Sequence, residues 1–152
     1  YANFAWIGGT LLLSSLAYGF GEEMGWRGFA LPHLQHGRSA LSATLILAVF
    51  WALWHIPMFF YRFEFGVGQV IGFFIGLLSG TIWMTCLYNS TGGSTLSNAL
   101  WHFVWNIVNI IGLVVSVEAV SVMSALVMVA AVVIVIVWKP ERLSPAQPHA
   151  IE

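Results

Sequence analysis

The sequence has 152 residues, of which 59% are hydrophobic and only 7% are charged, and its mean hydropathy is +0.87. Because soluble domains carry about a quarter charged residues, this composition excludes an ordinary soluble domain and predicts an integral membrane protein. A net charge of −1 without a cluster of Lys or Arg excludes nucleic acid as a partner.

Five apolar windows are each close to the roughly 20 residues that a membrane-spanning helix needs. They are expected at about 4–20, continuing to about 34, and then at about 40–61, 67–89, 95–115 and 119–138. The predicted fold class is all-α, a polytopic transmembrane bundle of about five helices with an intramembrane polar cavity. Residues 1–139 are expected to form this core. Residues 140–152 form a polar, proline-containing tail with the composition of an unpacked end.

The ends of the sequence and its single cysteine give little information about function. No basic segment and no cleavage site precede the first apolar run, so a signal peptide is not expected, and the sequence is expected to be the core of a longer chain. Cys86 has no partner for a disulfide within the chain. Its apolar surroundings predict a small buried residue.

The first apolar window runs into a dense group of charges, Glu22, Glu23 and Arg27. Ionised groups inside hydrocarbon cost at least a few kcal/mol each and usually face a functional cavity. On a helix Glu23 and Arg27 are four positions apart and are expected to pair. Glu22 points about 100° away and is the less paired acid, so it is the candidate general base. The alternative is a structural acid pair that ties two helices together.

The third apolar window carries a glycine at every fourth position, at Gly68, Gly72, Gly76 and Gly80. Such a stripe lines one helix face with hydrogen atoms and lets a neighbouring backbone approach closely. We therefore expect this face to pack against another helix. The segment Ser90 to Ser94 is a predicted turn.

The fourth window holds a polar stripe at Asn98, His102, Asn106 and Asn109, which recur every three or four positions on one helix face. Imidazoles and amides left unpaired in hydrocarbon cost several kcal/mol each, so the stripe needs polar partners. The available partners in the other windows are Glu22, Glu23, Arg27 and His55. The first, second and fourth windows are therefore expected to converge.

Each histidine also has a structural interpretation. His55 could donate to the carbonyl of residue 53, which Pro57 leaves without its usual helical partner. His102 and Asn106 could hold two helices together by hydrogen bonds of ordinary strength. His33, His36 and His149 lie in interfacial or tail segments and receive no role.

Three polar groups occur in a fixed order: Glu22-Glu23-x-x-x-Arg27, then His55, then His102-x-x-x-Asn106. This set resembles the ordered motifs of the CAAX protease and bacteriocin-processing family (CPBP, or Abi) of intramembrane proteases, which includes the type II CAAX prenyl endopeptidases. One position departs from the family pattern, in which a phenylalanine usually stands four residues before the histidine. Here that residue is Trp51.

The resemblance implies an intramembrane endopeptidase that hydrolyses a peptide bond of a membrane-associated, in some members prenylated, substrate. Glu22 would activate a water, His55 would help to hold it, and His102 and Asn106 would stabilise the oxyanion. Glu23 and Arg27 would support this site. A histidine and an amide one helical turn apart can supply two donors on the same face, which is what an oxyanion requires.

No cofactor is predicted outright. The helical zinc signature His-Glu-x-x-His is absent. Glu22, His55 and His102 could nevertheless form an open zinc site with water as the fourth ligand. A glutamate-activated water without a metal is the preferred interpretation.

Two other classes of function stay open. A proton-coupled transporter would also place charged side chains in a membrane cavity, although no inverted repeat is visible. A non-catalytic membrane immunity or interaction module would use the glycine face of the third window. In each case the partners are membrane lipids and a membrane-associated protein or peptide, and the expected location is a bacterial cell membrane. Several large aromatic residues could line a groove, namely Trp26, Trp51, Trp54, Phe59 and Trp105.

Overall fold

The computed structural model describes residues 2–60 and 65–151, with side chains for 8–60, 65–112 and 115–151. Within these ranges the protein is all-helical, which confirms the predicted fold class. The five long helices are α1 (Ala2–Gly25), α3 (Ala40–His55), α4 (Val67–Ser90), α5 (Thr95–Val115) and α6 (Val117–Arg142). Shorter pieces extend two of them: the π-helical η1 (Trp26–Ala30) and α2 (Leu31–Gln35) follow α1, and the 3₁₀ segment η2 (Ile56–Phe60) follows α3.

Within the part of the chain that the structure describes, three helical segments are long and apolar enough to cross a membrane: Ala40–Phe60, Val67–Ser90 and Val117–Arg142. Serine side chains fix where three of the long helices begin. Ser39, Ser94 and Ser116 each accept a hydrogen bond of 3.2 Å from the backbone N–H three residues later. Such caps satisfy donors that the first turn of a helix leaves unpaired.

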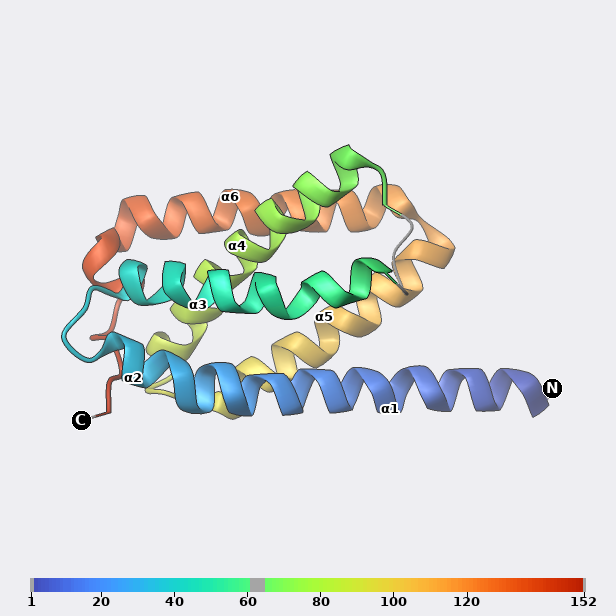
Figure 1. The fold of residues 1–152 in the computed structure, drawn as a ribbon, viewed down its shortest axis with the longest axis horizontal. Coiled ribbons are helices and arrows are strands. Elements are labelled where there is room, and N and C mark those ends of the chain that lie inside the picture. Colours follow the sequence, from blue (N-terminus) through green and yellow to red (C-terminus); the bar gives the residue numbers. More distant parts are fainter. Residues whose placement is uncertain (1, 61–64, 152) are drawn as a thin grey trace.

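The helices form an elongated bundle in which α1 and α6 lie on opposite sides of α3, and α4 and α5 cross them obliquely (Figure 1). The short connections after α2 and α4 and the C-terminal segment all lie at one end of the bundle (Figure 1). A buried hydrogen bond of 2.9 Å between the hydroxyls of Thr44 and Thr85 joins α3 to α4. Cys86 is buried beside this contact, as expected.

Two helix backbones approach each other closely at Gly19, where α1 meets α5. A Cβ atom at this position would lie 2.8 Å from the backbone nitrogen of Phe103, so only glycine fits without a backbone shift. The glycine stripe of α4 was expected to play this part, and that prediction is wrong. Counting neighbours among the described residues, Gly76 alone of the four has one within 4 Å of such a Cβ, the end of the Met128 side chain. Because α4 crosses its neighbours obliquely, one contact falls on the stripe rather than four.

Part of the C-terminal segment packs against the bundle. Leu143 and Ser144 are fully buried, so the expected unpacked end does not include them, while most side chains of residues 145–151 are exposed. Asn89 at the end of α4 and Gln35 of α2 exchange two amide hydrogen bonds, of 3.1 and 2.8 Å. The same amide nitrogen of Gln35 also donates to the carbonyl of His149 at 2.7 Å, and the same amide oxygen of Asn89 also accepts from its N–H at 3.1 Å. These backbone contacts with two buried amides hold the segment at His149.

Candidate active site

The three helices that carry the polar motifs meet around Trp51 of α3. Its indole N–H donates to the Glu22 carboxylate at 2.7 Å. The Arg27 guanidinium lies over its ring, 4.6 Å from the ring centroid. The rings of His55 and His102 stand edge-on to it, each with a centroid separation of 5.6 Å. The predicted convergence of the first, second and fourth apolar windows is therefore confirmed.

Glu23 and Arg27 form the buried pair that their spacing predicted. Oε1 of Glu23 lies 2.8 Å from Nη1 of Arg27, and both side chains are fully buried. The same oxygen lies 2.9 Å from Nδ1 of His102 on α5. Since a carboxylate oxygen accepts, the imidazole donates through Nδ1, and Nε2 is the ring atom left for another partner. Glu23 thus joins α1 to α5 and orients His102.

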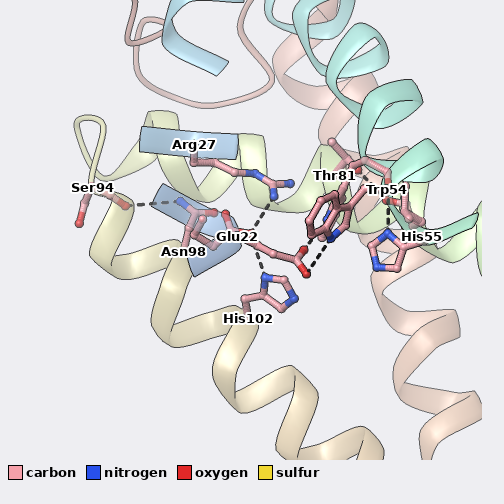
Figure 2. A network of polar contacts seen from close by, with 11 residues as sticks. Glu22, Arg27, Trp54, His55, Thr81, Ser94, Asn98 and His102 are labelled. Carbon is pink, nitrogen blue, oxygen red and sulfur yellow. Dashed lines mark hydrogen bonds and ion pairs between the residues drawn. The ribbon is translucent and has the colours of Figure 1, made fainter. Parts of the chain in front are cut away.

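Glu22 is partnered in a different way from its neighbour. Trp51 donates to one of its carboxylate oxygens at 2.7 Å, and Trp54 donates to the other at 3.3 Å. No ion pair involves Glu22 within the described ranges, so it is the less paired of the two acids, as expected. The side chain is half-buried. Figure 2 shows its carboxylate pointing toward Trp54, to which a dashed line joins it.

His55 closes α3 and binds the helix itself. Its Nδ1 lies 2.7 Å from the carbonyl oxygen of Trp51, so this nitrogen carries the proton and Nε2 is left as an acceptor. The structural interpretation named the carbonyl of residue 53, which instead accepts from the backbone N–H of Ile56. The other face of the ring lies against Phe73 of α4, with centroids 5.3 Å apart.

The polar stripe of α5 divides into members that reach another helix and members that do not. His102 binds Glu23, as described above. Asn109 donates to the carbonyl of Trp105 in its own helix at 2.8 Å, and Asn98 donates to Ser94 at 3.4 Å. The stripe was expected to meet polar groups of other helices. For the amide N–H groups of Asn98 and Asn109 this prediction is wrong, because they bind backbone carbonyls four residues earlier. Asn106 is half-buried one turn beyond His102, and within the described ranges its amide makes no hydrogen bond.

Glu22, His55 and His102 do not form a shared metal site. Among the described residues, no three His, Cys, Asp or Glu side chains lie close enough to bind one ion. The hydrogen bonds themselves do not exclude a metal, because Nδ1 of each histidine donates and Nε2 is left free among the described groups, as in most metal-binding histidines. The zinc alternative fails on distance, since the three side chains are not gathered around one point in this arrangement.

Two of the five aromatic residues named as groove candidates lie at the site, Trp51 and Trp54. Sequence reasoning noticed their size but missed their indole N–H groups as partners of Glu22. The signal was present in the spacing, since the two tryptophans are three positions apart and share a helix face. The remaining three pack elsewhere: Trp26 against the Leu31 core cluster, Phe59 with Phe73 and Phe74, and Trp105 on Trp101.

Comparison with known proteins places these motifs in a family. Residues 4–108 match the family model described as type II CAAX prenyl endopeptidase Rce1-like. The chain belongs to this family. The matched region of this CAAX endopeptidase family member runs from α1 into α5 and includes Glu22, Glu23, Arg27, Trp51, His55, His102 and Asn106.

A curated relative supports the membership of the chain in this family. CAAX prenyl protease 2 of Methanococcus maripaludis is 32% identical to it over 105 residues. The alignment covers 64% of the present chain and 38% of the relative, so the chain spans well under half of that protein. No solved structure matches the chain.

Proposed function

We propose that the chain is the core of an intramembrane endopeptidase that hydrolyses a peptide bond of a membrane-associated substrate. The observation that carries the proposal is the meeting of Glu22, His55 and His102 around Trp51, from three different helices. Family membership supports the same reaction class. Ionisable groups gathered inside a membrane bundle usually mark a substrate or proton site.

Glu22 acts as the general base. It takes a proton from water while the water oxygen attacks the peptide carbonyl carbon, and this gives a tetrahedral oxyanion. When the intermediate collapses, the C–N bond breaks and the proton passes from Glu22 to the leaving amine. The two indole hydrogen bonds leave lone pairs on each carboxylate oxygen, so Glu22 can still accept from a water.

His102 and Asn106 stabilise the oxyanion. Glu23 binds Nδ1 of His102, so Nε2 is the atom left to donate to the oxyanion. In this role both ring nitrogens carry protons, and the imidazolium is balanced by the Glu23 carboxylate. Asn106 follows one helical turn later with an amide that no other described group uses. Donors that are oriented before the reaction stabilise developing charge without reorganisation, and one such donor contributes about a hundredfold or more in rate.

His55 holds the attacking water. Its Nδ1 is fixed by the carbonyl of Trp51, so Nε2 is presented as an acceptor for a water proton. The ring also contacts Trp51 and Phe73, with centroid separations of 5.6 and 5.3 Å. Glu22 and His55 then accept the two protons of one water, and its oxygen lone pairs point at the substrate.

The names of the family and of the relative point to peptides near a prenylated C-terminus as the first substrates to test. A bacterial cell membrane stays the predicted location. The half-buried Glu22 lies beside Trp54, of which 55% is exposed on the surface of the bundle. A substrate held in the lipid could therefore approach the acid along this side.

The test uses the full chain in liposomes with a fluorogenic peptide that carries a prenyl group, and with the same peptide without it. Cleavage in H₂¹⁸O is expected to leave one heavy oxygen in the new carboxyl terminus. Glu22→Ala is expected to abolish cleavage, whereas Glu141→Ala, which removes an exposed acid at the end of α6, is expected to be neutral. Full cleavage by Glu22→Ala contradicts the assignment of the base.

A further inference from the structure

The contacts around Glu22 show that its carboxylate is held by tryptophan rather than by a cation. Of the two indoles that bind it, Trp51 makes the shorter bond, 2.7 Å against 3.3 Å for Trp54. Trp51 is also buried, with 6% of its surface exposed against 55% for Trp54. The buried Trp51 therefore holds the carboxylate in a defined orientation. The exposed Trp54 can break its hydrogen bond at little cost, because water can replace it.

Trp51 is itself fixed from several directions. The Arg27 guanidinium covers its ring face at 4.6 Å, and the two imidazoles stand against it at 5.6 Å each. A cation over an indole contributes about 0.5–1 kcal/mol when exposed and about 2 or more when desolvated. Arg27 is in turn locked by Glu23 at 2.8 Å. The direction of the Trp51 N–H is therefore set by residues of α1, η1 and α5 together.

We infer that Trp51 is a positioning residue that fixes the Glu22 carboxylate for water activation through its indole N–H. The inference rests on the proposed function. Glu22, His55 and His102 all contact the Trp51 side chain, so this one residue sets their relative positions. Trp54 plays a lesser part, because its bond is long and its ring lies in the open.

The first test compares tryptophan-to-phenylalanine variants of the full chain. Trp51→Phe keeps an aromatic ring and removes the N–H, and it is expected to lower kcat on the order of tenfold to a hundredfold with little change in KM, as for a misplaced catalytic group. Trp54→Phe is expected to lower kcat less. Trp83→Phe is the matched control, since the buried N–H of Trp83 has no partner among the described residues. Its kcat is expected to be unchanged.

A second variant keeps the test valid if Trp51→Phe does not fold. A benzothienylalanine at position 51 keeps the bicyclic shape, and a sulfur atom replaces the N–H. The same loss in kcat is expected. If kcat for either position-51 variant stays at the level of Trp83→Phe, the inference is overturned.

A stability measurement separates this inference from the proposed function. Trp51→Phe is expected to lower the thermal unfolding midpoint in the wild-type background, and to lower it much less in a Glu22→Leu background, where the N–H has lost its acceptor. Equal losses in both backgrounds would show that Trp51 does not bind Glu22, and would overturn the inference. A wild-type chain that cleaves no peptide would contradict the proposed function, while this comparison would still decide whether Trp51 holds the acid.

Discussion

One carboxylate oxygen of Glu23 accepts a hydrogen bond of 2.9 Å from His102, a residue 79 positions further along the chain. The same oxygen binds Arg27 at 2.8 Å. Glu23 is therefore committed to holding α1 against α5. The adjacent Glu22 meets only neutral indole donors among the described residues. Two consecutive acids thus have different surroundings because they point to different sides of one helix.

Arg27→Met is expected to destabilise the protein by about 3–5 kcal/mol, because it removes the arginine partner of the buried Glu23 carboxylate. Adding Glu23→Gln to Arg27→Met is expected to recover part of this loss. The measurement is the free energy of unfolding in a mild detergent. Arg38→Met is the control, since Arg38 is exposed in the connection after α2. An Arg27 variant as stable as this control would mean that the pair is not buried.

Gly19→Ala is expected to destabilise the bundle by about 1–3 kcal/mol, because the new Cβ would press on the backbone of Phe103 and a backbone cannot yield like a side chain. Gly72→Ala in α4 has open space around its Cβ. It is expected to stabilise by about 0.5–1 kcal/mol through helix propensity. Thermal unfolding of the two variants checks the opposite signs, and a destabilised Gly72→Ala would restore the glycine face as a packing surface.

Asn89→Ala is expected to loosen the C-terminal segment. The change leaves Gln35 and the N–H of His149 without their partner, and each buried group left unsatisfied costs about 1–3 kcal/mol. Hydrogen exchange at residues 143–151 is the measurement, and faster exchange is expected there than in the wild type. Ser90→Ala at the exposed end of α4 is the control. Unchanged exchange in Asn89→Ala would show that the amide pair does not hold the segment.

Asn106→Ala is expected to lower kcat by about a hundredfold or more, the usual effect of losing one oxyanion donor. Asn109→Ala is the matched control, because Asn109 uses its amide on the carbonyl of Trp105 in the same helix. Its kcat is expected to stay near that of the wild type. Equal losses in the two variants would assign Asn106 a structural role shared with Asn109.

Patterns within one segment of sequence correctly predicted features that depend on neighbouring residues, namely helix bounds and pairs within one helix. The helix expected at 95–115 runs over Thr95–Val115, where Ser94 caps its start. The pairing of Glu23 with Arg27 follows from a separation of four positions on one helix. Burial cost also predicted that the polar helices converge, since polar groups in hydrocarbon need partners.

Contacts between distant segments could not be predicted in the same way. The stripe of α5 required a partner but did not show whether His102 would meet Glu22 or Glu23, because that depends on how two helices rotate about their axes. A glycine stripe identifies a smooth face, and the crossing angle decides whether a neighbour covers it. At Gly19 a single glycine without a pattern accepts the close backbone. Trp51 was noticed as a departure from the family motif, but its bond to Glu22 spans two helices.

The most direct measurement compares Glu22→Gln with Glu23→Gln, each assayed for kcat and for the thermal unfolding midpoint. Glu22→Gln is expected to lose activity on the order of a thousandfold, the range of a general base, while its midpoint stays near that of the wild type. Glu23→Gln is expected to lower the midpoint, because it removes the charge that binds Arg27 and His102. A Glu22→Gln protein that still cleaves, beside a stable Glu23→Gln protein that does not, would contradict the division of roles between the two acids.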